Sequence, residues 1–391
     1  MKKLLFALIA LIPLTASAQK NPDIMVTDLR TAPQRREVTL PETLNGYNIY
    51  KADLHIHTIY SDGHCTPDFR VQEAYYDGLD ILAITDHIEY RRIEKKMMQF
   101  LKGYHDGKVM KHENDNVIKE AASERGILAD LNFSIKEAEK AAEKWGILII
   151  PAGEITREPV EIGHYNALFT KDVNKIYDPD PLQSLRNARK QGALIMHNHP
   201  GWRRTSCDKT EFEKQAYAEG LIDGIEVVNG SQCYPKMVQR AQEDGLFIAS
   251  STDHHTPTTD RYLAYGQIRN MTFILAEKCT LKSIREALEA RRTLAYTAGY
   301  VLGEEQLLKD FFKASVKFRV ISFDEKKGWT VEYRNTTSIP FKVSRGGVIH
   351  TISPFQTLNM VLGPKSNNAN LRVNSMLFDA KKTPVVEFSI K

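Results

Sequence analysis

Three short fragments of the chain combine histidine with carboxylate residues in a way that suits a site for several metal ions. They are residues 53–57 (Asp-Leu-His-Ile-His), 85–87 (Thr-Asp-His) and 252–255 (Thr-Asp-His-His). Imidazole and carboxylate ligands suit Zn, Mn or Fe, and a shared carboxylate can bridge two ions. Such ions make hydroxide from water and neutralise the charge of a phosphoryl group. The fragments therefore predict metal-dependent hydrolysis of a phosphate ester.

The candidate ligands nearly all fall at the ends of predicted strands. His55 and His57 are two residues apart, so in an extended strand both side chains point to the same face. At a strand end, both imidazoles can reach one ion. Further candidates from the residues alone are Asp62, Glu154, His164 and the histidines within residues 197–199 and 254–255.

Short apolar runs alternate with helical stretches between residues 49 and 303, and they predict the scaffold that positions these ligands. Strands are expected at residues 52–57, 80–85, 147–152, 165–169, 193–196, 222–228 and 246–250. Helices are expected at residues 67–77, 135–145, 181–190, 209–218 and 235–243. This alternation favours parallel βαβ units, and seven strands predict a (β/α) barrel one strand short of eight. Active sites of such barrels lie at the C-terminal ends of the strands.

Two segments depart from the barrel pattern. Residues 90–146 are charged and helical, and both a lid over the barrel mouth and a solvated peripheral insertion fit them. Residues 304–391 alternate apolar and polar side chains at period two between turn residues. The second segment predicts a small antiparallel β domain of sandwich type.

The N-terminus has the pattern of a bacterial secretory signal. Lys2 and Lys3 precede an apolar stretch from Leu4 to Leu14, which is too short to span a bilayer. Small residues at 16–18 predict cleavage after Ala18. Residues 19–48 then form a polar lead-in. The expected protein is periplasmic or secreted and has no membrane anchor after cleavage.

Composition excludes some classes of partner. The chain has 391 residues, with 53 Lys and Arg against 49 Asp and Glu, a formal charge of +4. This near-balance argues against a stable nucleic-acid partner bound by bulk charge. The cysteines, 65, 207, 233 and 279, form no Cys-x-x-Cys motif, and their pairing stays open. The oligomeric state is also open.

The motifs, in their order along the chain, resemble those of the PHP family, named for its polymerase and histidinol phosphatase members. The resemblance covers residues 51 to about 298. It is carried by residues 53–58 with 61–63 (Ser-Asp-Gly), 85–87, 153–154 (Gly-Glu), 199–201 (His-Pro-Gly) and 252–255. The resemblance implies an α/β fold, a distorted seven-stranded (β/α)7 TIM-like barrel, with two or three divalent ions of Mn, Zn or Fe.

The resemblance also implies how the ligands are shared. The implied sets are His55, His57, Glu154 and Asp253 for one ion, the bridging Glu154 with His164 and His199 for a second, and Asp62, His87 and His255 for a third. His197 and His199 both precede Pro200, so either could ligate. His199 fits the motif better, which leaves His197 as a residue behind the ligands, and His254 should point away.

Other polar residues are expected to support the ligands or the substrate. Asp53 and Asp86 could each orient an imidazole or cap the following turn. Glu226 lies in an apolar strand where an unpaired carboxylate would be costly, so a place at the barrel mouth is expected. Among the arginines, one of Arg157, Arg203 and Arg204 should face the substrate phosphate, because arginine offers forked donors to phosphate oxygens.

The expected reaction is hydrolysis by a hydroxide that bridges two ions, without a protein nucleophile. Asp253 would accept a proton from the water, and His255 or His199 would protonate the leaving group. Residues 154–157 and 163–168, the signal peptide and the β domain resemble exported PHP phosphodiesterases that act on organophosphate diesters. A small-molecule phosphodiester is therefore expected. The alternatives are a phosphomonoesterase of the histidinol-phosphatase or nucleotidase kind and a non-catalytic metal-binding module.

Overall fold

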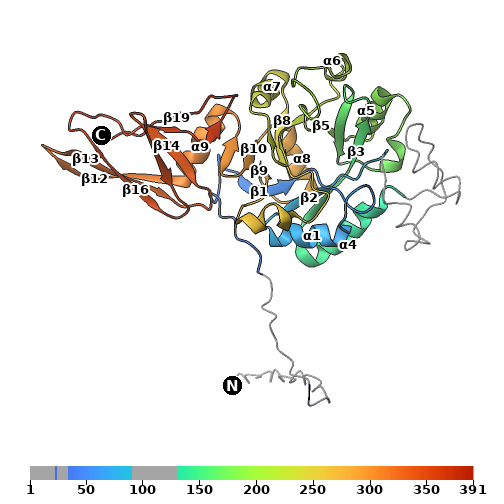
Figure 1. Cartoon of the computed structure of the whole chain (residues 1–391), viewed down its shortest axis with the longest axis horizontal. Coiled ribbons are helices and arrows are strands. Elements are labelled where there is room, and N and C mark those ends of the chain that lie inside the picture. Colours follow the sequence, from blue (N-terminus) through green and yellow to red (C-terminus); the bar gives the residue numbers. More distant parts are fainter. Residues whose placement is uncertain (1–22, 24–33, 90–129, 391) are drawn as a thin grey trace, which may run out of the picture. The chain divides into compact units, whose positions relative to one another are not determined.

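The computed structural model describes residue 23 and residues 34–89 and 130–390. Residues 35–391 form one compact unit (Figure 1). The predicted signal peptide, nearly all of residues 19–33 and residues 90–129 of the predicted insertion lie outside the described residues. Among the residues that are described, no helix is both long enough and apolar enough to cross a lipid bilayer.

One curled sheet of the described chain positions the candidate ligands. Its twelve strands run in the order β18-β11-β10-β9-β1-β2-β3-β4-β5-β6-β7, and β8 pairs with β6. The strands are β1 (Asn48–Asp53), β2 (Ile81–Ile84), β3 (Leu148–Arg157), β4 (Gly163–Leu168), β5 (Leu194–His197), β6 (Gly224–Asn229), β7 (Gln232–Cys233), β8 (Phe247–Ser251), β9 (Met271–Ala276), β10 (Thr293–Thr297), β11 (Tyr300–Leu302) and β18 (Met376–Leu377). Because β8 also lies against β9 and β10, the sheet curls into a half-barrel, and this confirms the distorted α/β barrel fold that the family resemblance implied.

Helices cover the outside of this sheet (Figure 1). They are α1 (Pro67–Tyr76), α4 (Phe133–Trp145), α5 (Pro181–Lys190), α6 (Glu211–Ala218), α7 (Lys236–Asp244), α8 (Leu281–Glu289) and α9 (Glu305–Ser315), with short 3-10 turns η1 (Val173–Lys175), η2 (Thr258–Asp260) and η3 (Leu263–Tyr265). Capping side chains fix the N-termini of several of these helices. Thr210 and Glu213 form a capping box at α6, which satisfies two backbone N–H groups that the helix leaves unpaired. All five predicted helices are present.

The main difference from the prediction concerns β4, which was expected to be a parallel strand. It pairs antiparallel with both β3 and β5. The physical reason is loop length: only residues 158–162 separate β3 from β4, and a parallel crossover needs a dozen residues or more. The sequence reading also placed β1 up to residue 57, whereas the regular strand ends at Asp53. Strands β9 and β10 were not predicted.

The C-terminal residues form two further antiparallel sheets, as predicted. One has the order β12-β13-β16 and the other β15-β14-β17-β19. Their strands are β12 (Val316–Asp324), β13 (Gly328–Asn335), β14 (Phe341–Arg345), β15 (Val348–Ile352), β16 (Thr357–Leu362), β17 (Leu371–Val373) and β19 (Val385–Val386). Residues 376–377, within the predicted β domain, return to the barrel as β18 and pair with β11.

A buried ion pair links the end of β1 to the chain that follows β8. The Arg269 guanidinium lies 2.5 Å from Asp53 Oδ2 and 2.9 Å from Asp77 Oδ2, and Arg269 is fully buried. Asp53 also accepts hydrogen bonds from the backbone and side chain of Thr252. Charges in the interior need such partners because desolvation is costly.

We expect Arg269→Met to lower the free energy of unfolding by about 3–5 kcal/mol, because it leaves Asp53 buried without its cation. The matched control is Arg186→Met, which removes an exposed pair with Glu219 and should lower the free energy of unfolding far less. Urea unfolding measures both changes. Equal effects of the two substitutions would contradict the buried-pair interpretation.

Candidate metal centre

The first two candidate ligands lie on an extended segment just beyond β1. His57 N donates to His254 O at 3.2 Å, and Asp253 N donates to His55 O at 2.8 Å. The chain after β8 therefore runs beside residues 55–57 like a further strand. Alternation then places the imidazoles of His55 and His57 together, while Ile56 is buried in the hydrophobic core.

Four of the candidate ligands surround one point. His55 Nε2 and His57 Nε2 are 3.1 Å apart. Asp253 Oδ1 lies 3.3 Å from the first and 3.1 Å from the second. Glu154 adjoins them, with Oε1 3.3 Å from His55 Nε2 and Oε2 3.6 Å from His57 Nε2. Tetrahedral ligands with bonds of about 2.1 Å would lie about 3.4 Å apart, so these separations fit a shared ion.

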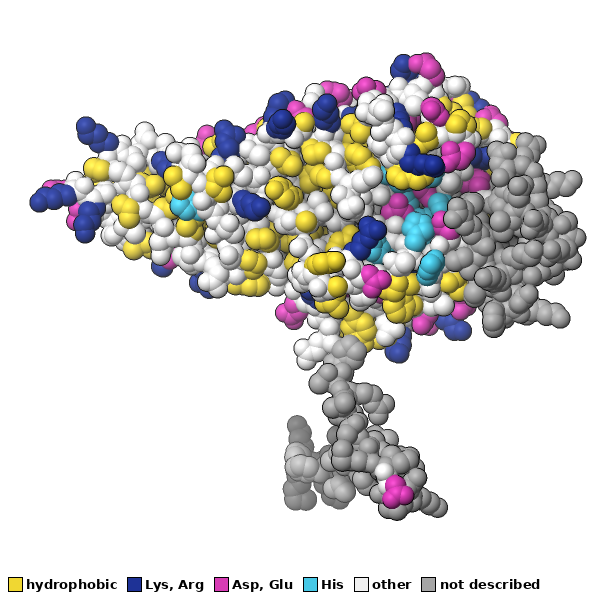
Figure 2. Space-filling model, in the orientation of Figure 1, with side chains coloured by type: hydrophobic (Ala, Val, Ile, Leu, Met, Phe, Trp, Pro, Cys, Tyr) yellow, Lys and Arg dark blue, Asp and Glu magenta, His cyan; other side chains and the backbone are white. Residues whose placement is uncertain are grey.

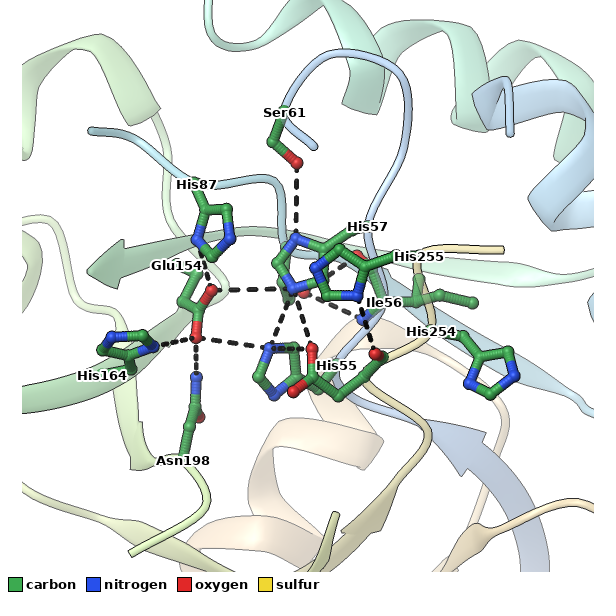
Figure 3. Close-up of polar contacts among 12 residues, drawn as sticks. His55, Ile56, His57, Ser61, His87, Glu154, His164, Asn198, His254 and His255 are labelled. Atoms are coloured by element: carbon green, nitrogen blue, oxygen red, sulfur yellow. Dashed lines mark hydrogen bonds and ion pairs between the residues drawn. The ribbon is translucent and has the colours of Figure 1, made fainter. Parts of the chain in front are cut away.

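Glu154 is the common member of two ligand groups. His55, His57 and Glu154 form one compact group, and Glu154, His164 and His199 form another. Glu154 Oε1 is 3.4 Å from His164 Nδ1 and 3.7 Å from His199 Nε2. Figure 3 shows the His164 imidazole directed toward the carboxylate. A carboxylate in this place has the position required of a bridge between two ions.

A third group gathers around Asp62. Its members are His57, Asp62, His87 and His255. Asp62 Oδ1 lies 3.0 Å from His255 Nε2 and 3.4 Å from His87 Nε2. This oxygen is buried, and among the described residues it has a hydrogen-bond donor only when one of these two rings carries a proton on Nε2. Since buried polar atoms are almost always satisfied, a cation is the natural partner for it.

The ring nitrogens that face away from these points have defined partners. His55 Nδ1 is 3.0 Å from Glu226 Oε1. His57 Nδ1 is 3.3 Å from Ser61 Oγ, which itself donates to Asp86 Oδ1 at 2.7 Å. A proton on each Nδ1 leaves the Nε2 lone pairs of both rings directed at the shared point, which is how outer partners prepare imidazole ligands.

Charges in the site depend strongly on one another. Burial lowers the pKa of His87, but the Glu154 and Asp62 carboxylates outweigh it and raise that pKa to about 10. Burial likewise opposes protonation of His55, while Asp253, Glu226 and Glu154 raise its pKa well above the usual range. In the opposite direction, burial raises the pKa of Glu154, but His87 and His55 hold it well below the ordinary value. The buried carboxylates of the site are thus stabilised by positive charge close to them.

Backbone geometry at the ligands is unusual for non-glycine residues. His199 has φ of 25° and Asp253 has φ of 50°. Such left-handed conformations cost about 1–3 kcal/mol and cluster at functional sites. Near Asp62, a Cβ on Gly63 would lie 2.7 Å from the carbonyl oxygen of His57. Glycine is therefore required for the loop to fold closely over the strand end.

Other residues predicted from the sequence lie behind the ligands. His197 contacts Tyr217 OH at 3.0 Å and Glu213 at 3.3 Å, so of the two histidines it is His199 that joins a ligand group. Asp86 accepts from Thr58 and Ser61 and anchors their loop. His254 points away from the centre in Figure 3.

The three arginines have different surroundings. The Arg157 side chain is 9% exposed, pairs with Glu89 at 3.0 Å and donates to Ser184. Arg204 is 12% exposed and pairs with the buried Glu213. In contrast, Arg203 is 63% exposed, and its carboxylate partner Glu158, at 3.5 Å, is 60% exposed. Arg203 lies over the Trp202 ring, which packs 5.3 Å from both His164 and His199 between ring centroids.

Sequence reasoning missed several residues that hold the centre in place. Asn198 donates to Glu154 Oε1 at 2.8 Å and to Asn166 at 2.9 Å. Asn229 bridges Glu226 and Asp253 at 2.9 and 3.1 Å. Only their positions in the sequence could have pointed to these two residues. Asn198 lies between His197 and His199, and Asn229 is the last residue of β6. Figure 2 shows histidine and acidic side chains reaching the surface together over this site.

Comparison with known proteins agrees with this geometry. The PHP domain model matches residues 53–230. The crystal structure of a two-domain protein from Bacteroides vulgatus, containing a predicted PHP-like metal-dependent phosphoesterase, has 32% sequence identity and a TM-score of 0.78, and the match covers 92% of this chain and 100% of that one. A search of curated proteins found no match.

Two more distant structures were also found. An amidohydrolase from Chromobacterium violaceum has 17% identity and a TM-score of 0.35, with 54% of this chain and 89% of that chain covered. A lesion-specific endonuclease from Pyrococcus furiosus has 16% identity and a TM-score of 0.39, with 66% and 59% covered. The chain matches the Bacteroides vulgatus protein along nearly its whole length, and it also matches the PHP domain model. It therefore belongs to the PHP family of metal-dependent phosphoesterases.

Proposed function

We propose that this PHP phosphoesterase hydrolyses small-molecule phosphodiesters with two or three divalent ions, Mn, Zn or Fe. The observation that carries the proposal is the sharing of Glu154 between two ligand groups. When bound, such ions supply hydroxide at neutral pH and neutralise charge on attacking and leaving oxygens. The proposed ligand sets are His55, His57, Glu154 and Asp253; Glu154, His164 and His199; and Asp62, His87 and His255.

The protein groups around the centre have distinct proposed tasks. Asp253 Oδ2 accepts from Asn229, while Oδ1 faces the imidazoles and is placed to take a proton from the attacking water. The His255 side chain is 36% exposed, whereas those of His55 and His57 are fully buried. Its greater exposure supports His255, ahead of His199, as the residue that protonates the leaving group.

The arginine geometry favours a diester. A phosphodiester carries a single negative charge, and Arg203 is the one arginine of the three candidates that is largely exposed. Arg157 and Arg204 already pair with buried carboxylates. One guanidinium suits a monoanion, and forked donors match two phosphate oxygens. We also keep the prediction that the chain is exported and cleaved after Ala18.

The decisive experiment compares hydrolysis of bis(p-nitrophenyl) phosphate with that of p-nitrophenyl phosphate, with Mn, Zn and Fe supplied separately. We expect preference for the diester. His55→Ala should reduce the rate more than about 100-fold, because even outer partners of a metal ligand are worth 10–100-fold. The control is His350→Ala in the β domain. A monoester preference would make the protein a phosphatase, and inactivity with metal bound would favour a non-catalytic module.

Arg203→Met should raise KM for the diester about tenfold or more, since a hydrogen bond to a charged group is worth about 1.5–3 kcal/mol. The thermal unfolding temperature should stay unchanged, because the side chain is exposed. Arg334→Met, an exposed arginine on β13, is the matched control. An unchanged KM for Arg203→Met would remove this residue from the substrate site.

Metal binding should release protons at pH 7. The pKa of His87 is about 10 without metal, and that of His55 is also raised, so both rings carry protons that an ion must displace. Affinity should consequently rise with pH. Calorimetry of Mn binding in two buffers of different ionisation enthalpy measures the release. Binding with no proton release would contradict the assigned ligands.

A further inference from the structure

Large apolar side chains are exposed mainly on the C-terminal sheets. Of the eleven such side chains in the described part of the chain, seven lie between residues 316 and 390. Five of these seven belong to the β12–β13 hairpin and the neighbouring strand edges. They are Ile321 (46% exposed), Phe323 (47%), Val348 (57%), Ile349 (65%) and Val361 (66%).

These five residues lie near the ends of three strands, β12, β15 and β16. The last residues of β12, from Ile321 to Asp324, are all exposed. Phe323 packs on Trp329 with ring centroids 4.4 Å apart, and Trp329 pairs with Leu362 of β16. Leu362, Val361 and Val348 line one open hollow of about 510 Å³. Val361 and Val348 therefore lie at one hollow between β16 and β15, whereas Ile349 follows Val348 on the opposite side of β15. We call these five residues the hairpin surface.

Basic residues surround the hairpin surface. Lys326 and Lys327 lie in the β12–β13 turn and Lys365 follows β16, and all three are exposed. The acidic residues of the same turn are Asp324 and Glu325, and Asp324 already accepts the backbone N–H groups of Lys326 and Lys327. At the end where Figure 1 labels β12 and β13, Figure 2 shows Lys and Arg side chains beside apolar ones.

Charge is divided unevenly along the chain. Residues 316–391 contain twelve Lys and Arg against five Asp and Glu, a formal charge of +7. Since the whole chain has +4, residues 1–315 carry −3. The C-terminal sheets are therefore a basic module attached to an acidic barrel, which indicates an anionic partner for the module.

We propose that the hairpin surface and its lysines dock the protein on an anionic phospholipid bilayer. The exposed groups are mostly aliphatic, and hydrocarbon is the environment that accepts Ile and Val side chains. Single-stranded nucleic acids instead use aromatic platforms for the bases, and only Phe323 of the five is aromatic. Lysines around inserted apolar residues add attraction to anionic headgroups.

The test is co-sedimentation of the purified protein with vesicles, using the same amino terminus in every variant. Vesicles of phosphatidylcholine and phosphatidylglycerol in a three-to-one ratio are compared with phosphatidylcholine alone. We expect binding to the anionic vesicles only, weakened by added salt. The double variant Lys326→Gln/Lys327→Gln should bind about 25-fold more weakly, since each lysine near such a surface contributes about fivefold.

Two further variants separate docking from general charge and from misfolding. Phe323→Ser with Ile321→Ser should weaken vesicle binding about tenfold or more without changing phosphoesterase activity. The matched control Lys313→Gln/Lys317→Gln removes the same charge at exposed positions of α9 and the start of β12, and it should bind normally. Equal loss in the control, equal binding to neutral vesicles, or binding to single-stranded DNA but not to anionic vesicles would overturn the proposal.

Discussion

The carboxylate of Glu154 is the constraint on which the rest of the site depends. It is 1% exposed, and an unpaired charge in that position would cost several kcal/mol. Its two oxygens lie within 2.6–3.7 Å of imidazole nitrogens that come from β4 and from the chain after β1, β2 and β5. In the absence of metal, His55 and His87 supply this charge as protonated rings, because the pKa of each is raised by the carboxylates around it, and in the presence of metal they would be neutral ligands. The same geometry serves both states because the carboxylate needs positive charge either way.

This constraint explains why β3 continues past its parallel partner. The register of β2 with β3 ends at Ile84 and Pro151, yet β3 runs on to Arg157 as half of a hairpin with β4. Glu154 therefore lies on a paired strand, opposite Asn166. Asn166 in turn donates to Leu54 O and accepts from Asn198. A carboxylate held on both sides in this manner has little freedom to move.

The sequence predicted the elements whose signal is local. The His-x-His pair, the capped helices and the alternating strands after residue 316 all carry a periodicity or a residue type that one segment can show. The sequence could not show which of three arginines faces the substrate, because all three have the same side chain. Only burial and ion-pair partners distinguish Arg157, Arg203 and Arg204. Asn198 and Ser61 act by hydrogen bonds to groups distant in the chain, which no local pattern reveals. The direction of β4 was readable in principle, because the five-residue loop before it excludes a crossover.

The C-terminal sheets, which carry the proposed docking surface, are joined to the barrel at several points. The chain leaves the barrel through α9, forms β12 to β17, and returns at residues 376–377 to extend the barrel sheet beside β11. Two hydrogen bonds between Thr39 and Ser338 also restrain this junction. Thr39 N donates to Ser338 Oγ at 2.9 Å, and Ser338 N donates to Thr39 O. A module joined by three chain crossings and a backbone pairing is not a flexible tether. Docking through it would therefore hold the metal centre in a fixed orientation toward the surface that carries its substrate or partner.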